Sequence, residues 1–293
     1  MRVAIVGAQG QLGAAVAQEF GAAHDVVALG HSDLDVTDDR QIVGVIARVK
    51  PETIINCAAY NDVDGAEDHP VDALNVNAFA VRALALAAAS HDAVLVHYST
   101  DFVFDGTTTT PYVEDDRPNP RSVYAMSKLL GEWFAADAPQ SYVMRVESLF
   151  GRAPGARPAK GSVATILNTL TAGREMRVFE DRVISPSYVI DVAVATRELL
   201  GRRPPSGLYH CVNSGTCTWL EFARELGRQL GLEPRLVPTR MADVPLRAAR
   251  PQYCALSNGK LAAAGVLMPT WQDALGRYLA ACRNDIAQQI PRR

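Results

Sequence analysis

Short and almost continuously apolar segments alternate along the first half of the chain with longer segments whose apolar residues recur every three to four positions. The apolar runs predict strands, and the periodic segments predict helices. Strands buried on both faces indicate a parallel sheet that is covered by helices and connected by right-handed crossovers. The predicted strands span 3–6, 26–29, 53–56, 93–98 and 142–146, and the predicted helices span 12–20, 40–49, 73–90 and 124–134.

This alternation predicts an α/β fold in which residues 1–150 form a Rossmann-type doubly wound domain that binds NADP(H). The second half is interrupted by prolines, and residues 151–293 are expected to form mainly a smaller substrate-binding lobe. A segment near 188–212 is expected to return to the first domain. Residues 152–161 are rich in Pro, Gly, Ala and Arg, which predicts a mobile loop.

One helix in the second half has a clear start. Apolar residues recur with helical spacing over 219–230, and Thr218 precedes them with Glu221 three residues later. This spacing is typical of a capping box.

Composition narrows the class of protein. The chain has 293 residues, of which 48% are hydrophobic and 21% charged, as in ordinary globular proteins. A net charge of −3 gives no overall attraction to nucleic acid or to an anionic membrane. No unbroken apolar run reaches the ~18 residues of a membrane span, and no signal peptide precedes the first strand. The five cysteines form no CxxC pair, so we expect reduced thiols in a cytoplasmic protein.

Three glycines, Gly7, Gly10 and Gly13, follow the first predicted strand and open the first helix. Glycine lets the backbone turn tightly and approach a pyrophosphate. The first helical residues, Gln11 and Leu12, then present free N–H groups and the positive end of the helix dipole. The pattern predicts a dinucleotide-binding turn.

The end of the second strand bears on the choice of nucleotide. It reads Gly30-His31-Ser32, without the acid that holds the ribose 2′-hydroxyl of NAD. The missing carboxylate favours NADPH, with NADH as the alternative. His31 is a candidate contact for the 2′-phosphate, and a solvated loop residue is the other interpretation. Ala58 and Ala59 follow the third strand and are small enough for the backbone to lie against the cofactor.

Tyr124 and Lys128 are four residues apart on one predicted helix, so they share a face. An ammonium near the phenol stabilises phenolate and lowers its pKa from about 10, which makes tyrosine a usable acid and base. Ser99, Thr100 and Asp101 end a buried strand, where open α/β sheets bind their ligands. A hydroxyl there can polarise a substrate carbonyl, and strand capping is its alternative role. The set indicates ketone reduction.

With these motifs the chain resembles the dTDP-4-dehydrorhamnose reductases, a family of extended short-chain dehydrogenases/reductases. The resemblance implies NADPH-dependent reduction of the 4-keto group of dTDP-4-dehydro-L-rhamnose, a step in nucleotide-sugar and cell-wall polysaccharide biosynthesis. The matching stretches are 7–13, 34–38, 56–67, 97–106, 124–132, 207–210, 214–219 and 250–251.

The resemblance also implies roles for individual residues. Tyr124 protonates the new alkoxide, Lys128 keeps Tyr124 reactive and binds the nicotinamide ribose, and Thr100 rather than Ser99 assists at the keto oxygen. The members expected nearer the ligands are Asp35 and Val36 beside the adenine, Tyr98 along the cofactor, Asp101 beside the sugar, and Arg250 at the pyrophosphate or in a surface salt bridge.

Two departures from the family pattern concern the sugar side. Leu149 stands where the family often has a tryptophan, and 181–187 differs from the family's Asp-Gln-x-Gly-x-Pro-Thr stretch. Glutamates that bridge a metal-linked dimer in some relatives are replaced here by Ala15 and by residues in 188–190. We therefore expect no metal, and a homodimer stays open.

Three alternatives remain. A reductase of another dTDP-4-keto-6-deoxy sugar would differ only in its pocket. A non-catalytic NADP-binding regulatory subunit would not need the intact set of Tyr124, Lys128 and Thr100. An epimerase or dehydratase shares the fold, but a dehydratase usually needs an acid pair, and Thr100-Asp101 supplies one acid.

Overall fold

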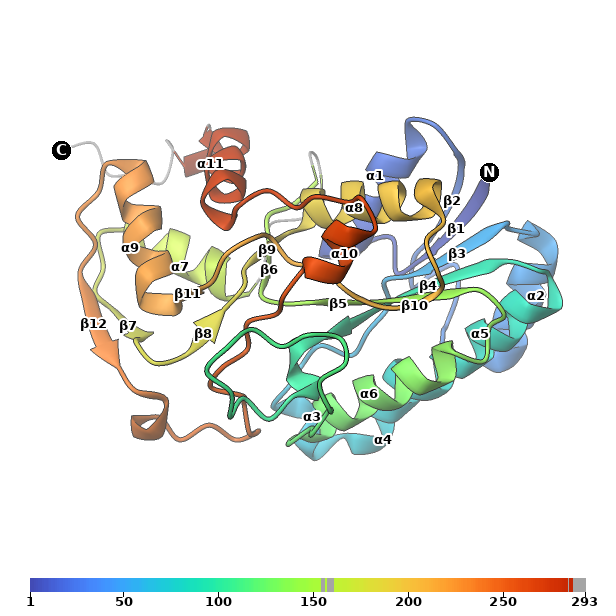
Figure 1. Ribbon diagram of the computed structural model, residues 1–293, viewed down its shortest axis with the longest axis horizontal. Helices are drawn as coiled ribbons and strands as arrows, with labels where there is room; N and C mark the ends of the chain where they lie inside the picture. Colours follow the sequence, from blue (N-terminus) through green and yellow to red (C-terminus); the bar gives the residue numbers. More distant parts are fainter. Residues whose placement is uncertain (154–155, 157–160, 284, 287–293) are drawn as a thin grey trace.

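The framework of the protein is a six-stranded parallel sheet (Figure 1). The computed structural model describes residues 1–153, 156, 161–283 and 285–286, so most of the loop predicted at 152–161 lies outside the described residues. The sheet confirms the predicted Rossmann-type doubly wound α/β fold. In spatial order its strands are β10 (Gly207–His210), β5 (Ser141–Val146), β4 (Val94–Thr100), β3 (Thr53–Asn56), β1 (Arg2–Val6) and β2 (Asp25–Leu29).

Helices cover both faces of this sheet (Figure 1). Val3 and Ile5 of β1 belong to the hydrophobic cluster shared with α1 and α8, whereas Ala4 and Val6 belong to the cluster on the opposite face. Because both faces are covered, the strands appear as continuous apolar runs in the sequence. The covering helices are α1 (Gln11–Gly21) and α8 (Val189–Arg202) on one face, and α2 (Asp39–Val49), α5 (Ala80–Ser90) and α6 (Val123–Ala135) on the other.

The helix predicted at 73–90 begins earlier and contains an irregular turn. It consists of α4 (Pro70–Leu74), the π-helical turn η1 (Asn75–Phe79) and α5. Asn77 in this turn is fully buried, and its amide donates to Tyr60 O and Ser127 Oγ, both at 3.0 Å. The π-helical turn therefore connects α6 with the loop after β3.

The same run, Pro70–Ser90, is long and apolar enough on average to cross a membrane. This differs from the expectation drawn from unbroken apolar runs, because polar residues interrupt this helix without lowering its mean hydropathy far. Of its most apolar 18-residue stretch, 56% is buried inside the protein. Its apolar side is thus used by the fold itself.

A second hydrophobic core lies in the later half of the chain, at the left of Figure 1. The predicted capping box is present, since Thr218 Oγ1 accepts from Glu221 N at 3.1 Å and Glu221 Oε2 accepts from Thr218 N at 2.7 Å. The helices of this core are α7 (Ser162–Thr171), α9 (Trp219–Leu230) and α11 (Trp271–Ala281). Its short strands are β6 (Leu149–Phe150), β7 (Met176–Phe179), β8 (Val183–Ile184), β9 (Ser187–Tyr188), β11 (Cys217–Thr218) and β12 (Leu236–Thr239).

The two halves of the chain are interleaved. α8 packs against α1, and β10 pairs with β5 to complete the main sheet. Three short elements lie near the carboxyl edge or between the cores: α3 (Gly65–Asp68), the 3-10 turn η2 (Asp101–Val103) and α10 (Gly259–Ala263). A domain boundary near residue 150 stays a prediction.

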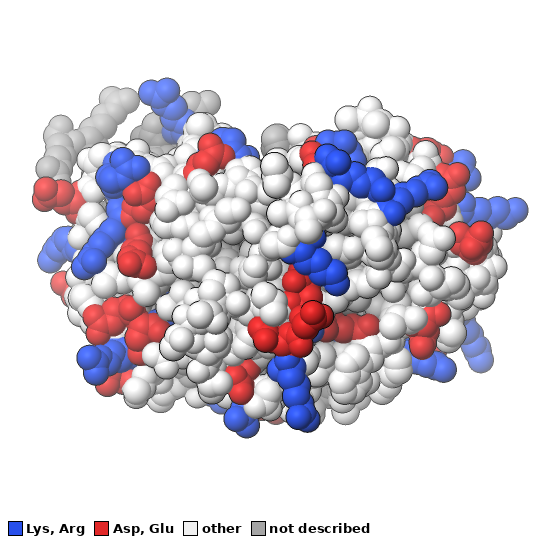
Figure 2. Space-filling model, viewed as in Figure 1, with Lys and Arg blue, Asp and Glu red and all other residues white. Residues whose placement is uncertain are grey.

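Charges of both signs are interspersed over the face shown in Figure 2. This mixture agrees with the small net charge of −3. The face drawn therefore offers no extended basic surface to a polyanion.

Candidate active site

The candidate residues gather at the carboxyl edge of the parallel sheet. The chain runs outward from β1 to β2 and then returns to β3 on the other side of β1, so the strand order reverses between β1 and β3. Open α/β sheets bind ligands outside this reversal point. The glycine turn follows β1 here, Ala58 and Ala59 follow β3, and Thr100 ends β4.

The glycine turn has the shape that a pyrophosphate requires. Gly7 has a φ of +76°, and a Cβ there would lie 2.7 Å from Ala58 N. A Cβ on Gly13 would lie 2.2 Å from Gly7 O. No side chain caps α1 after Gly10, so the N–H groups at its start, beginning with Gln11 and Leu12, remain free for an anion. The cradle therefore fits a dinucleotide.

Gln11 has a further role that the sequence did not indicate. Its side-chain amide donates to Gly151 O at 2.7 Å. The bond joins the start of α1 to the chain just after β6. It thereby links the glycine turn to the segment that leads into the second core.

The end of β2 differs from the sequence-based interpretation. A side chain at Gly30 would collide with Gln9, whose Nε2 lies 2.4 Å from the expected Cβ position. A carboxylate nevertheless reaches this corner, because Asp33 Oδ2 accepts from Gly30 N at 2.8 Å. Asp33 comes 20 residues after Gly13, which is the usual interval to the acid that binds the ribose, and this spacing is the signal by which the sequence indicates it. His31 is exposed on the same turn.

Asp35 and Val36 follow this turn. The carboxylate of Asp35 accepts from Thr37 N at 2.9 Å and from Thr37 Oγ1 at 2.7 Å, and these bonds lower the pKa of Asp35. Val36 is partly buried and packs against the cluster beneath α2 and α5. Placement beside an adenine ring stays a prediction for both residues.

Tyr124 lies close to Thr100 and Asp101. Ser122 caps α6 by accepting from Ala125 N at 3.3 Å, and this cap places Tyr124 in the first turn. Burial first and then the charge of Asp101 raise the pKa of Tyr124, whereas a hydrogen bond with Thr100 opposes the rise. The fold thus brings together the predicted acid and its hydroxyl partner.

Lys128 is buried one turn further along α6. Its Nζ donates to Tyr98 O at 2.6 Å, and burial lowers its pKa to about 8 despite the opposing effect of Glu132. The sequence predicted that Lys128 would lower the pKa of Tyr124. In this arrangement the pKa of Tyr124 is raised instead, because burial and Asp101 act on it and the ammonium is directed at the Tyr98 carbonyl.

The chain is similar to known proteins over almost its whole length. Residues 1–284 match the family model described as RmlD substrate binding domain. The chain is 37% identical over 301 residues to a dTDP-4-dehydrorhamnose reductase of Mycobacterium tuberculosis (strain ATCC 25618 / H37Rv), covering 99% of this chain and 97% of the relative.

Two solved structures are similar over nearly their whole length. A dTDP-4-dehydrorhamnose reductase of Clostridium acetobutylicum has a TM-score of 0.91 and 32% identity, covering 97% of this chain and 100% of that chain. The Bacillus anthracis dTDP-4-dehydrorhamnose reductase in complex with NADP has a TM-score of 0.89 and 32% identity, with coverages of 95% and 98%. The chain belongs to the dTDP-4-dehydrorhamnose reductase family.

Within the dTDP-4-dehydrorhamnose reductase fold, this chain places a second buried acid behind Thr100. Glu147 follows β5 directly, and the ligand atoms of Asp101, Glu147 and Cys254 all lie within 4.8 Å of one another. Glu147 accepts from Ser185 N and, at 3.1 Å, from Ser148 Oγ. The sequence indicates one acid here, because Asp101 and Glu147 meet only when β4 and β5 pair.

The surroundings of this pair raise both carboxyl pKa values. Burial raises the pKa of Asp101 to about 6, against the opposing charge of Arg182. Burial and the charge of Asp101 raise the pKa of Glu147 well above its ordinary value. Asp101 was expected beside the sugar, and the structure places its side chain in this cluster with 3% exposure.

Ser99 and Thr100 have separate partners. Ser99 Oγ donates to Glu132 Oε1 at 2.5 Å, and the same carboxylate accepts from Arg145 Nε at 2.8 Å and Nη2 at 2.7 Å. Glu132 and Arg145 are both buried. This network occupies Ser99, and Thr100 is the hydroxyl beside Tyr124. The catalytic role of Thr100 stays a prediction.

Tyr98 and Leu149 are two further residues that the sequence predicted for the site. The Tyr98 hydroxyl is 2.6 Å from Thr196 Oγ1 on α8, so it is the backbone carbonyl of Tyr98 that meets Lys128. Leu149 in β6 is partly buried against the cluster of α1 and α8. Their contacts with cofactor and sugar stay predictions.

Arg250 forms a salt bridge. Its Nη1 and Nη2 donate to the carboxylate of Asp64 at 2.9 and 2.7 Å, and Ala248 N donates to the same carboxylate at 3.0 Å. These bonds lower the pKa of Asp64 to about 2. Of the two roles considered for Arg250, the structure contains the salt bridge. A contact with the pyrophosphate stays a prediction.

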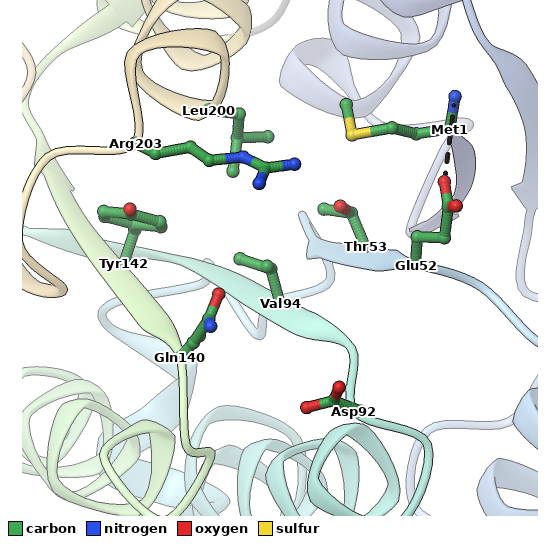
Figure 3. Close-up of a pocket in the computed structure, with 9 residues that line it drawn as sticks. All are labelled: Met1, Glu52, Thr53, Asp92, Val94, Gln140, Tyr142, Leu200 and Arg203. Atoms are coloured by element: carbon green, nitrogen blue, oxygen red, sulfur yellow. Dashed lines mark ion pairs between the residues drawn. The ribbon is translucent and has the colours of Figure 1, made fainter.

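A hollow of about 240 Å³ lies away from these residues (Figure 3). It is at the amino edge of the sheet, where Thr53, Val94 and Tyr142 begin their strands, and Met1 N is 3.7 Å from Glu52 Oε2 at its rim. The catalytic candidates are at the opposite ends of the strands. The hollow is therefore separate from the candidate active site.

Proposed function

We propose that this protein catalyses the NADPH-dependent reduction of the 4-keto group of dTDP-4-dehydro-L-rhamnose to dTDP-L-rhamnose, with NADH as a second cofactor. The observation that carries the proposal is the placement of Tyr124 beside Thr100 and Asp101 at the carboxyl edge of the sheet, next to the glycine cradle. Membership of the dTDP-4-dehydrorhamnose reductase family supports the same reaction, as does the NADP complex of the Bacillus anthracis relative.

The glycine cradle and the start of α1 would hold the cofactor's pyrophosphate, and the bound nicotinamide supplies a hydride to C4 of the sugar. Tyr124 gives its phenolic proton to the alkoxide that develops at the 4-oxygen. Its raised pKa keeps it protonated at neutral pH, which suits a reduction. The Thr100 hydroxyl, which donates to Asp101 in this structure, would turn to donate to the same oxygen and stabilise the developing charge.

Lys128 has two roles in this step, one toward the cofactor and one toward Tyr124. With a pKa of about 8 it is mainly protonated at neutral pH. Its ammonium donates to the Tyr98 carbonyl and would hydrogen-bond the nicotinamide ribose of a bound cofactor. The positive charge would also stabilise the phenolate left on Tyr124 after proton transfer.

A reductase of another dTDP-4-keto-6-deoxy sugar is the second candidate. The observation that favours it is the buried group of Asp101, Glu147 and Arg182. Arg182, and Leu149 two residues after Glu147, fall where the chain departs from the family pattern. A regulatory NADP-binding subunit accounts less well for the arrangement of Tyr124 and Thr100.

The reaction has a small-molecule dTDP-sugar as its substrate, and we place it in the cytoplasm without nucleic-acid, membrane or metal partners. All five cysteines are free thiols, which agrees with a reducing compartment. A homodimer is the remaining partner to test, by measuring the mass in solution.

The direct test mixes the purified protein with enzymatically prepared dTDP-4-dehydro-L-rhamnose and follows NADPH absorbance, with Tyr124→Phe as the matched variant. We expect dTDP-L-rhamnose as the product and a loss of about 10²–10⁴-fold in kcat for the variant. Turnover of a different dTDP-4-keto sugar alone would establish the second candidate. Tight NADPH binding without turnover of any such sugar would establish the regulatory subunit.

A further inference from the structure

The carboxylate of Asp33 lies at the end of β2. Asp33 itself is three residues further along the chain than Gly30, the residue that follows the strand. Asp33 Oδ2 accepts from Gly30 N at 2.8 Å. The turn is closed by two backbone bonds to Gly30 O, from Asp33 N at 3.0 Å and from Leu34 N at 3.1 Å. The carboxylate is therefore held beside Gly30 by a defined turn.

This turn and the glycine turn share one corner of the molecule. The carbonyl of Leu29, the last residue of β2, accepts from Gly7 N at 2.9 Å and from Ala8 N at 3.1 Å. The side chain of Gln9 lies against Gly30, so a side chain at residue 30 would require Gln9 to move. Residue 30 carries no acid, and Asp33 supplies a carboxylate from the next turn.

The other acids nearby are already engaged. Asp35 accepts twice from Thr37, and Asp38 caps α2 by accepting from Arg40 N at 2.9 Å and Gln41 N at 3.2 Å. Asp33 is exposed, and among the described residues Gly30 N is its side chain's donor. Its second carboxylate oxygen is left to accept from a ligand.

We propose that Asp33 sets the choice between NADH and NADPH, by accepting from the 2′-hydroxyl of NADH and opposing the 2′-phosphate of NADPH. A carboxylate at the end of the second strand has this effect in dinucleotide-binding folds. The inference rests on the cofactor site of the proposed function and revises the interpretation that no carboxylate is present. The exposed imidazole of His31 on the same turn is the opposing group that admits the phosphate.

The test measures dissociation constants of NADPH and NADH by calorimetry, without any sugar. Asp33→Asn keeps an oxygen that accepts from Gly30 N and removes the charge. We expect this change to shift the NADPH-to-NADH affinity ratio about ten- to a hundredfold towards NADPH, the range of a hydrogen bond to a charged group. Asp33→Glu keeps the charge, so we expect it to prefer the same dinucleotide, NADPH or NADH, as the parent protein.

Asp137→Asn is the matched control, because Asp137 is an exposed acid beyond the end of α6. It removes the same charge and is expected to leave the ratio unchanged. His31→Ala is expected to move the ratio towards NADH. A ratio in Asp33→Asn within about twofold of the parent's would overturn the proposal, and so would an equal shift in Asp137→Asn.

The sugar substrate plays no part in these measurements. A failed reductase assay with normal dinucleotide binding would reject the proposed substrate and leave the role of Asp33 supported by its own shift. Failure of both dinucleotides to bind would overturn the role of Asp33 together with the cofactor site.

Discussion

The hydroxyl of Thr100 donates to Oδ1 of Asp101 at 3.0 Å, while no described residue donates to the other oxygen of that buried carboxylate. Asp101 is thus joined to the hydroxyl for which we propose a catalytic role, and it also faces Glu147 and Arg182. The charge state of this acid bears on both stability and catalysis.

Replacing Asp101 with asparagine is expected to change how stability depends on pH. Folding raises the pKa from 3.8 to about 6, so the folded state binds this proton more tightly than the unfolded chain. The stabilisation is fully present below pH 3.8 and is lost as pH rises through about 6. Asp101→Asn should therefore have the larger free energy of unfolding at neutral pH, by on the order of 1–3 kcal/mol.

Urea unfolding of Asp101→Asn and the parent between about pH 4 and about pH 8 checks this. The exposed Asp137→Asn is the control and should follow the parent. Parallel curves for Asp101→Asn and the parent would contradict the placement of a buried, proton-binding acid.

The rate of sugar reduction should fall as pH rises through about 8, where Lys128 loses its proton. The phenol of Tyr124 titrates at still higher pH, since burial and Asp101 raise its pKa. Lys128→Arg carries a permanent charge, so its residual kcat/KM should lack this alkaline decline. The measurement is a pH profile of kcat/KM for the parent and for Lys128→Arg. An identical alkaline decline in both proteins would show that a group other than Lys128 causes the decline.

Gly13 and Gly21 form a matched pair at the two ends of α1. A Cβ on Gly13 would lie 2.2 Å from Gly7 O, whereas a Cβ on Gly21 would meet nothing within 4 Å. Gly13→Ala is expected to weaken NADPH binding at least about tenfold by displacing the glycine turn. Gly21→Ala should bind NADPH normally and gain up to about 1 kcal/mol of stability. Calorimetric titration and thermal unfolding provide the readouts, and equal NADPH affinity of the two variants would contradict the close packing of the turn.

The ion pair of Arg250 and Asp64 should make a small, acid-sensitive contribution to stability. Asp64 is 46% exposed, so solvent screening limits the coupling to at most about 1 kcal/mol. Folding lowers the pKa of Asp64 from 3.8 to about 2, so the contribution is present above pH 3.8 and is lost as pH falls towards 2. A double-mutant cycle of Arg250→Met and Asp64→Asn measures it. A coupling that persists unchanged at acid pH would show that it does not arise from this charge pair.

The strands and the pairing of Tyr124 with Lys128 could be predicted because both depend on local pattern. A strand covered on both faces must be apolar throughout, and two residues four apart on a helix share a face. The π-helical turn at Asn75–Phe79 was missed, because one extra residue per turn leaves the apolar periodicity of the long helix almost unchanged.

The features that could not be predicted depend on contacts between distant segments. Asp101 and Glu147 come together through the register of β4 with β5, which places Thr100 opposite Val146. The raised pKa of Tyr124 follows from burial among such segments, and a sequence does not state burial. Asp33 was overlooked because its carboxylate reaches back three residues through a turn.

The late arrival of β10 has a consequence for synthesis of the protein. β5 ends at Val146, but its outer neighbour begins at Gly207, after α7, the short strands β6 to β9 and α8. Until that segment leaves the ribosome, the edge of β5 has unpaired N–H and C=O groups, and α1 lacks its cover from α8. A nascent chain halted near residue 150 would thus hold an aggregation-prone open edge, and the first half reaches its final form only when much of the second has been made.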